Sequence, residues 1–318
     1  MLTGFRLHCY RFRLQCQQTV TLPPFSGSTL RGAFASTFRR LSCQQPQRRE
    51  CAGCVLEGVC AFPAVFEPRP PAEATKAGGF ASFPRPFVVV PPGNGQLDHR
   101  PGSSLAAGLA LIGQGNDYLP YFILALAQLA REGIGRGRGS VAVEQVTSYH
   151  PLSEESAPVW EGGDSPVRAA CLPITWEQIV AHAGRWDADA LHLRFVTPTC
   201  LLADRSMACE PTFATLIRCL LRRYTRLAQA YCGASPELPY RELLERAEAV
   251  QIAASSLVYH GWERYSRRQD RRVPARGIAG TISYAGPLSE FLPLVLLGSL
   301  AHVGDNAALG QGRYEVVG

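Results

Sequence analysis

The sequence has almost no lysine. Lys76 is the only lysine among 318 residues, so apart from seven histidines every basic side chain is an arginine. A single lysine excludes an active site that moves protons between two lysines, and it leaves guanidinium groups to bind anions over most of the surface. Guanidinium groups donate paired hydrogen bonds to phosphate, and the formal net charge is +6. The composition therefore favours a polyanionic partner, although a mildly basic enzyme without such a partner would have the same charge.

The sequence also lacks a long apolar segment. Its longest apolar runs are about 13 residues, short of the about 20 that a helix needs to cross a bilayer. The first ten residues alternate like a strand and are interrupted by charge, unlike a secretory signal. Eleven cysteines, an odd number in a long chain, do not resemble a secreted disulfide framework. We therefore expect a soluble, reduced, cytoplasmic protein with no membrane partner.

One pattern occurs twice in the chain. Residues 278–317 read as a strand, an apolar helix, a glycine-rich loop and a closing strand, and residues 118–143 read as a helix, a glycine-rich loop and a strand. An internal repeat constrains the architecture more strongly than any single element. Two copies roughly 170 residues apart predict two similar domains rather than a solenoid.

The order of elements predicts the fold of each domain. Strand, helix, strand, strand, helix, strand is the ferredoxin-like βαββαβ order, with helices on one face of an antiparallel sheet. We therefore expect an α+β protein of two tandem ferredoxin-like, RRM-like domains. The predicted boundaries are residues 1–161 for the first domain with an insertion at 43–60, residues 162–189 for a linker, and residues 190–318 for the second domain.

The insertion contains four closely spaced cysteines. Cys43, Cys51, Cys54 and Cys60 include a C-x2-C pair beside a glycine. Four thiolates at this spacing can surround a zinc ion tetrahedrally, and the metal would fold a stretch with little apolar content. An iron–sulfur cluster uses the same ligands and is the less favoured alternative, and incidental cysteines are a third. Four cysteines leave no open position, so a metal here is expected to be structural.

The most basic stretch is predicted to be the tip of a hairpin. Two strand patterns, residues 252–259 and 280–283, flank it. Arginines interleaved with aromatic rings are typical of surfaces that bind RNA through phosphates and stacked bases, whereas a solvated basic tip is the alternative. The residues expected to contact RNA here are Trp262, Arg264, Tyr265, Arg267, Arg268, Arg271 and Arg272.

Further arginines and glycines lie where phosphates could bind. Glycines let backbone N–H groups approach an anion, but neither glycine-rich loop has the pattern of a P-loop or a dinucleotide-binding loop. The remaining predicted RNA contacts are Arg31, Arg39, Arg40, Arg136, Arg138, Gly304, Gly310, Gly312 and Arg313. A second helix is expected from Pro211 to about Tyr231, with its arginines largely off its apolar face, and the sequence indicates no role for it.

Four stretches carry a family resemblance. They are Gly27-Ser-Thr-Leu-Arg-Gly32-Ala, Pro120-Tyr-Phe with Gly133-Ile-Gly-Arg-Gly-Arg-Gly139, Trp262-Glu-Arg-Tyr-Ser266-Arg-Arg-Gln, and Ala301-His-Val-Gly304 with Gly310-Gln-Gly312-Arg-Tyr. In these stretches the chain resembles the CRISPR-associated RAMP superfamily, and more closely its stand-alone endoribonucleases that cut precursor CRISPR RNA within the repeats. The resemblance covers nearly the whole chain apart from residues 162–190, and the four-cysteine insertion is similar to that of one branch.

The resemblance implies a metal-independent cleavage of CRISPR repeat RNA. The ribose 2′-hydroxyl would attack the adjacent phosphorus, leaving a 2′,3′-cyclic phosphate and a 5′-hydroxyl, with a base, an acid and positive charge supplied by the protein. Members commonly use a histidine near the first helix with a tyrosine and a lysine. Residues 17–60 of this chain contain none of these three residue types.

The catalytic candidates therefore come from elsewhere in the chain. His302 ends an apolar helix beside the second glycine-rich loop, although a helix C-cap is its alternative role. His260 and Tyr259 lie at the root of the basic hairpin, where stacking or simple exposure is the alternative. The other histidines that the alternation places in strands or helices, and that we expect to be structural, are His8, His182 and His192.

Three functions remain open from the sequence. The first is an endonuclease that recognises and cuts a CRISPR repeat. The second is a catalytically silent RNA-binding subunit of a CRISPR ribonucleoprotein effector complex, which would have other subunits as partners. The third is a zinc-dependent enzyme, which four cysteine ligands argue against.

Overall fold

The computed structural model describes residues 1–69, 83–93, 96–203, 206–234, 236–266 and 271–317. The chain divides into two compact units, which we call the N-terminal unit (residues 6–173 and 230–233) and the C-terminal unit (residues 1–5, 174–229 and 234–318). The boundary near residue 173 falls inside the stretch 162–189 that was expected to be a linker. The second half of that stretch contains helix α5 (Trp176–Ala183) and belongs to the C-terminal unit, so it is not a bare linker.

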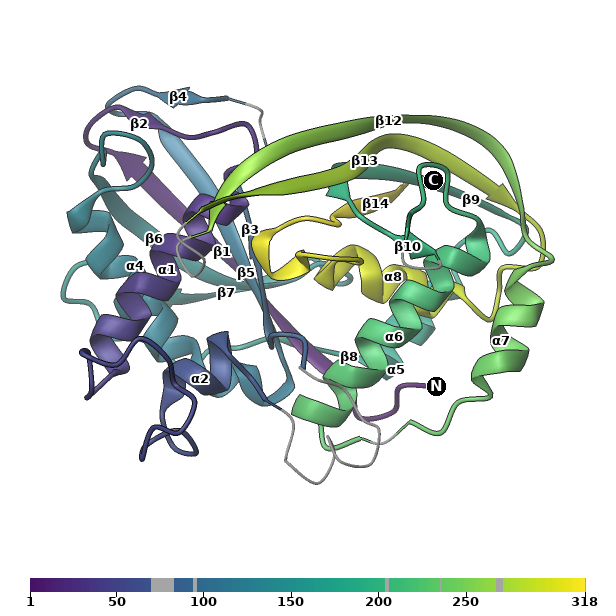
Figure 1. The fold of residues 1–318 in the computed structure, drawn as a ribbon, viewed down its shortest axis with the longest axis horizontal. Helices are drawn as coiled ribbons and strands as arrows, with labels where there is room; N and C mark the ends of the chain where they lie inside the picture. The colour runs from purple at the N-terminus through teal and green to yellow at the C-terminus, as the bar shows by residue number, and fades with distance from the viewer. Residues whose placement is uncertain (70–82, 94–95, 204–205, 235, 267–270, 318) are drawn as a thin grey trace. The chain divides into compact units, whose positions relative to one another are not determined.

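The N-terminal unit has the predicted order of strands and helices. Its main elements are β1 (Arg6–Cys16), α1 (Gly27–Ser42), β3 (Phe87–Val90), β5 (Ser104–Ile112), α4 (Leu119–Glu132) and β6 (Val141–His150) (Figure 1). The strands pair antiparallel in the order β3-β5-β1-β6, followed by β7 (Glu155–Trp160) at one edge. The predicted βαββαβ fold of this unit is confirmed.

Several smaller elements of the N-terminal unit were not predicted. They are α2 (Ala61–Phe66), the 3₁₀ turn η1 (Gly113–Tyr118), strand β7 and the two-stranded pair of β2 (Val20–Thr21) with β4 (Asp98–His99), together with the short β8 (Pro173–Thr175), which crosses the boundary into the C-terminal unit. Helix α2 follows directly after the cysteine insertion, and its Phe66 ring packs on Phe38 of α1 with ring centroids 5.1 Å apart. It therefore closes the insertion onto the core.

The core of the N-terminal unit is rich in phenylalanine. The apolar face of α1 brings Phe34 and Phe38 to within 6.0 and 5.4 Å of the Phe122 ring of α4, measured between centroids. Phe87 of β3 lies 5.4 Å from the same ring. Edge-on and tilted aromatic packing of this kind stabilises beyond the burial of area alone. It fixes both helices on one face of the sheet.

The C-terminal unit repeats the same topology. Its main elements are β9 (Ala190–Thr199), α6 (Phe213–Tyr231), α7 (Tyr240–Ala247), β12 (Gln251–Ser266), β13 (Arg271–Ala285), α8 (Leu292–Ala301) and β14 (Tyr314–Val317), with β10 (Leu202–Ala203), β11 (Ser206–Met207) and the turn η2 (Ala307–Leu309) in the connections. The sheet order β12-β13-β9-β14 is the order of β3-β5-β1-β6 with each strand in the corresponding place. The predicted duplication is therefore confirmed.

One face of this second sheet is apolar and the other is polar. Leu191, Leu193 and Phe195 of β9 are buried, whereas His192 and Arg194 between them are exposed. Alternate side chains of a strand point to opposite faces, so β9 faces the core on one side only. On the core side, Phe213 of α6 packs against the ring of Tyr284 at 5.2 Å between centroids.

The first residues of the chain are part of the C-terminal unit. Leu2 and Phe5 are buried, and the Phe5 ring lies edge-on to Tyr224 of α6 with centroids 5.8 Å apart. In the other direction, residues 230–233 at the end of α6 belong to the N-terminal unit. The chain therefore passes between the two units more than once.

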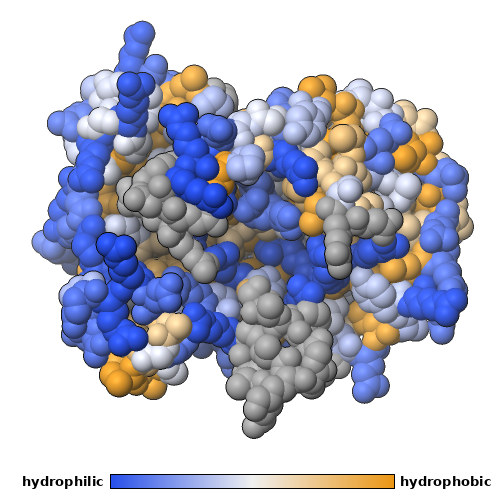
Figure 2. All heavy atoms as spheres, viewed as in Figure 1, coloured by the Kyte–Doolittle hydropathy of each residue, from blue (hydrophilic) through white to orange (hydrophobic). Residues whose placement is uncertain are grey.

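One face of the molecule carries many hydrophilic residues. Figure 2 shows hydrophilic residues over most of one face, with apolar residues interspersed among them. In the part of the chain that the structure describes, no helix is both long enough and apolar enough to cross a bilayer.

Candidate nucleic-acid interface

The first glycine loop (residues 133–139) is exposed at its tip. Arg136 and Arg138 are exposed, and the backbone N–H of Arg136 donates to the Thr21 carbonyl of β2 at 2.8 Å. Gly133, Gly135 and Gly137 all have positive φ, which glycine adopts without steric cost. The loop is thus held along β2 while its two guanidinium groups reach solvent. That Arg136 and Arg138 contact RNA stays a prediction, which their exposure permits.

The second glycine loop (residues 302–313) is built differently, and His302 is a core residue. Its side chain is only 1% exposed, and its Nδ1 lies 3.0 Å from the Gln311 carbonyl oxygen. Burial lowers the pKa of His302 to about 3, although the Gln311 carbonyl opposes this shift. The prediction that His302 is catalytic is wrong in this structure, because its imidazole is enclosed and neutral and cannot contact an RNA on the surface.

The glycines of the second loop let backbone segments pack closely and do not present the loop to solvent. Gly310 and Gly312 are buried, and a Cβ at Gly312 would overlap the Val303 carbonyl oxygen. Gly304 is half-buried against the Cys200 carbonyl. The prediction that Gly310 and Gly312 contact RNA is therefore wrong here. Arg313 is half-buried, and its guanidinium pairs with Glu315 at 3.2 Å.

The arginines of α1 are largely engaged inside the N-terminal unit. Arg31 lies over the Phe66 ring at 5.3 Å from its centroid. Arg39 donates to the carbonyl oxygens of Arg48 and Arg49, which fixes the start of the cysteine insertion on α1. Arg40 forms an ion pair with Glu132 of α4. Their predicted role in RNA contact is not supported, because each guanidinium already has a structural partner.

The basic hairpin is formed by β12 and β13 in register. Arg271 and Arg272 are exposed on β13, and Arg272 pairs with Glu263 at 3.5 Å between side chains that are both largely exposed. Trp262 and Arg264 are half-buried on β12, and burial lowers the pKa of Arg264. Tyr265 lies in β12, but its side chain is outside the described part of the structure. Arg267 and Arg268 fall outside the described residues altogether.

Tyr259 and His260 project to opposite faces of β12. Tyr259 is paired with buried Ile278 of β13, and His260 is paired with Gly277. Tyr259 is nevertheless 55% exposed, because β12 is an edge strand that extends past the core. Neighbouring residues of one strand cannot act on the same phosphate from one side of a sheet. His260 and Tyr259 therefore cannot form the catalytic pair that their adjacency suggested.

A polar surface that the sequence did not single out surrounds His260. We call it the outer sheet face, and it consists of His192, Arg194, Ser256, His260, Thr281 and Ser283. His192 Nδ1 lies 2.7 Å from Ser283 Oγ, and Ser256 and Thr281 hydroxyls lie 2.8 Å apart. Arg194 pairs with Glu315 of β14. The alternation of residues 190–196 could have identified His192 as outward-facing, since Leu191 and Leu193 are clearly apolar.

Burial separates the seven histidines into two groups. His8, His99, His150 and His302 are each at most 5% exposed, and burial lowers the pKa of His8 to about 4. Only three histidines reach the surface, namely His182, His192 and His260. Two of these three share the outer sheet face. This face is where a histidine could act as a base or acid on bound RNA.

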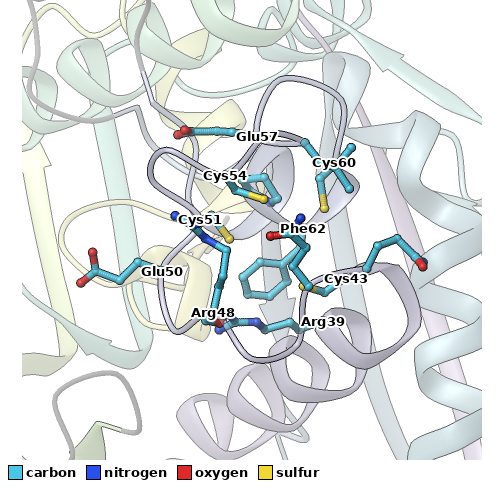
Figure 3. Close-up of a pocket in the computed structure, with 13 residues that line it drawn as sticks. Arg39, Cys43, Arg48, Glu50, Cys51, Cys54, Glu57, Cys60 and Phe62 are labelled. Atoms are coloured by element: carbon cyan, nitrogen blue, oxygen red, sulfur yellow. Dashed lines mark hydrogen bonds between the residues drawn. The ribbon is translucent and has the colours of Figure 1, made fainter.

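The four cysteines of the insertion line one pocket. Figure 3 shows the sulfur atoms of Cys43, Cys51, Cys54 and Cys60 turned toward a common space beside the Phe62 ring. Burial raises the pKa of the Cys51 thiol to about 11, and the charge of Glu67 raises it further, while Arg39 opposes the shift. All four thiols are free in the structure.

These cysteines provide the right donors for a zinc ion. Four sulfur ligands within one pocket fit a structural tetrahedral site in number and in kind. Within the described residues, however, no three metal-binding side chains are already arranged around a single point. The structure therefore brings the predicted ligands together without forming a closed ligand shell.

The comparisons with known proteins agree with this architecture. Two tandem βαββαβ units of one topology are the architecture that the resemblance to the RAMP superfamily implied. Residues 5–172 match the AF_1859_N family model, described as an N-terminal domain, and residues 193–314 match the model of the CRISPR-associated endoribonuclease Cas6. The chain belongs to the CRISPR-associated RAMP-type endoribonucleases, so the family resemblance seen in the sequence is confirmed.

Solved structures of Cas6 proteins share the fold. A product complex of Thermus thermophilus Cas6 (TTHB231) is 17% identical, with a TM-score of 0.57 over 98% of this chain and 99% of that one. A partial Cas6-RT-Cas1–Cas2 complex is 13% identical, with a TM-score of 0.60 over 100% of this chain and 47% of the other. A second Cas6 product complex (TTHA0078) is 20% identical, with a TM-score of 0.51 over 98% and 100%. A comparison with curated protein sequences found no match.

Proposed function

We propose that this protein binds the repeat of precursor CRISPR RNA and cleaves it by attack of a ribose 2′-hydroxyl. The Cas6 model that matches residues 193–314 supports an endoribonuclease. The observation that carries the proposal is the outer sheet face, where accessible His260 lies on β12 of the basic hairpin and accessible His192 lies on β9, which pairs with β13. No other part of the described chain presents two histidines on one exposed surface.

The proposed reaction needs one base, one acid and a positive charge. His260 takes the proton of the 2′-hydroxyl as the bond from O2′ to phosphorus forms. The bond from phosphorus to O5′ then breaks, and O5′ takes up a proton from solvent water, leaving a 2′,3′-cyclic phosphate and a 5′-hydroxyl. Exposed Arg271 and Arg272 at the hairpin supply charge near the phosphates. His192, held 2.7 Å from Ser283, is the second candidate for proton transfer.

Tyr259 has a different place in this proposal. Its ring is more than half exposed on the opposite side of β12 from His260. An exposed aromatic ring beside arginines is suited to stacking on an unpaired base. We therefore assign Tyr259 to RNA binding, in place of the catalytic role that its neighbour suggested.

The cysteine pocket is proposed to hold a structural zinc ion. Cys43, Cys51, Cys54 and Cys60 would be its ligands, and the metal would tie the insertion together without taking part in cleavage. Arg39, which bonds to the Arg48 and Arg49 carbonyls, already anchors one end of the insertion on α1.

The test is cleavage of a labelled repeat RNA in EDTA, with the same RNA carrying a 2′-deoxy sugar at each position in turn. We expect a single cut that one deoxy substitution abolishes, and a product ending in a 2′,3′-cyclic phosphate. His260→Ala should reduce the single-turnover rate by roughly 100-fold or more, the usual contribution of a positioned general base. Variant His192→Ala shows whether the second histidine takes part, and Tyr259→Ala should mainly weaken binding.

The rival function is a silent RNA-binding subunit of a CRISPR ribonucleoprotein complex. It is favoured by one observation: residues 17–60 contain no histidine, tyrosine or lysine, and His302, the histidine beside the second glycine loop, is buried. Tight binding of the repeat RNA with no product after long incubation would refute cleavage and establish this alternative.

A further inference from the structure

Helix α6 carries a row of arginines that the proposed site does not use. Arg218, Arg222 and Arg226 follow one another at intervals of four residues. Residues four apart on a helix lie on the same side, each about 6 Å further along the axis. We call these three residues the arginine stripe. Arg222 is exposed, and Arg218 and Arg226 are half-buried.

Two arginines of the stripe lack a neutralising carboxylate. Neither Arg218 nor Arg222 has an ion pair with any acidic residue that the structure describes. Arginines of the adjoining helix α7 differ in this respect, since Arg241 pairs with Glu245 at 2.9 Å and Arg246 pairs with Glu290 at 2.7 Å. Two cations four residues apart repel each other, so this arrangement favours an anion from outside.

The surroundings of the stripe support a binding surface. Arg222 and Arg226 stand four residues apart on α6, and burial lowers the pKa of Arg226, with the charge of Arg222 lowering it further. Tyr240 of α7 lies alongside, 38% exposed, with its hydroxyl donating to the Arg218 carbonyl at 3.3 Å. The stripe is thus a line of positive charge with an aromatic ring at its edge.

The neighbouring Arg223 has a structural role, in contrast to Arg218 and Arg222. Its guanidinium turns inward and donates to the Ala301 carbonyl at the end of α8, at 3.2 Å. It satisfies one of the carbonyl groups that a helix leaves unpaired at its C-terminus. Arg218 and Arg222 have no such internal acceptor among the described residues.

We propose that the arginine stripe binds the sugar–phosphate backbone of RNA, with successive guanidinium groups on successive phosphates of one strand. This rests on the proposed function, because the RNA is the one that the protein binds for cleavage. A straight row of regularly spaced cations matches the regular spacing of phosphates along a strand, whereas a single small anion would need converging groups. Contact to the backbone carries no sequence information, so the stripe adds affinity and leaves repeat recognition to other residues.

The test is a salt titration of RNA binding. The repeat RNA and a scrambled RNA of equal length are each titrated against the full chain, the variant Arg222→Gln and the double variant Arg218→Gln/Arg222→Gln. The matched control is Arg241→Gln, which removes one exposed, ion-paired arginine from the adjoining helix. Thermal melts verify that each variant is folded.

We expect Arg222→Gln to weaken binding roughly fivefold at about 0.1 M salt and to reduce the slope of log K against log salt by about 0.7. The double variant should lose about twice that slope, and the loss should be equal for the repeat and the scrambled RNA. Arg241→Gln should change neither quantity. A folded double variant with the slope of the parent protein would overturn the inference while leaving cleavage intact, whereas a parent protein that does not bind RNA would overturn the proposed function as well.

Discussion

The two glycine loops have the same sequence pattern and different physical roles. In the first, Arg136 and Arg138 are exposed at the tip of a loop held along β2. In the second, the residues that close the loop, among them His302 and Gly312, are buried. A run of glycines after an apolar helix thus specifies only that the backbone turns sharply. Whether the turn faces a ligand or the core is decided by what packs on it.

The packing partners of the two loops explain the difference. The first loop is held along a two-residue strand, β2, which leaves its tip free. The second loop lies against β9, with the Gly312 amide donating to Pro198 and the Asp305 amide to Cys200, at 3.2 and 3.0 Å. The Tyr224 hydroxyl of α6 also donates to the His302 carbonyl at 2.6 Å. The second loop therefore completes the core of its unit.

The largest expected effect is on stability, and it contrasts the two loops directly. Gly312→Ala would place a Cβ against the Val303 carbonyl at a φ of 74°, whereas Gly137→Ala, at a φ of 81°, has open space around it. We expect Gly312→Ala to cost about 3 kcal/mol or more and Gly137→Ala only about 1 kcal/mol, the strain of a left-handed residue. Urea unfolding measures both, and equal losses would contradict the contrast.

A smaller effect concerns acid stability. The pKa of His302 is lowered to about 3 in the folded protein, so the unfolded chain, with an ordinary value near 6.5, binds the proton more tightly. Stability from the neutral histidine is complete above about pH 6.5 and declines as the pH falls toward 3, by about 2 kcal/mol at pH 5.

The variant His302→Asn tests this pH dependence. Asparagine does not titrate in this range, and it meets the same backbone strain as histidine at this position, where φ is 64° and ψ is 165°. We expect the variant to be less stable than the parent at pH 7 but to lose less stability between pH 7 and pH 5. Identical profiles of melting temperature against pH for the two proteins would show that His302 does not cause the loss of stability in acid.

The smallest effect concerns RNA affinity, and it compares one arginine of the first glycine loop with one of the second. Arg136→Gln removes an exposed guanidinium of the first loop, and we expect roughly fivefold weaker RNA binding at about 0.1 M salt, with no measurable change in melting temperature. Arg313→Gln in the second loop should change affinity less, because its guanidinium is half-buried and paired with Glu315. A larger loss for Arg313→Gln than for Arg136→Gln would reverse the roles that we assign to the loops.

The regular elements were predictable because their signals are local. The alternation of Leu191, Leu193 and Phe195 and the helical spacing of Phe34 and Phe38 each lie within one element. Two elements, strand β7 and helix α2, were not predicted because each contains a proline. Strand β7 contains Pro158, which is tolerated only at a sheet edge, and α2 contains Pro63 in its first turn, where no intrahelical N–H bond is lost.

The candidate site was less predictable, because it depends on contacts between distant residues. Nothing near His302 in the sequence reveals that residues 198 and 200 close over its loop. The pairing of Ser283 with His192 joins residues 91 positions apart. Arg39 looked like a surface cation, yet it anchors the cysteine insertion through two backbone carbonyls. Exposure, which decides whether a side chain can meet RNA, is a property of the assembled sheet.

Each unit includes a short segment that is distant in sequence from the rest of that unit, and this affects how the chain folds during synthesis. Leu2 and Phe5 leave the ribosome before Tyr224 of α6, which is part of the surface that buries them and is made more than two hundred residues later. Conversely, the N-terminal unit receives residues 230–233 only after α6 is made. Neither half is complete when its main segment has been translated, so a single cut near residue 173 would yield two fragments that each lack a piece of their own core.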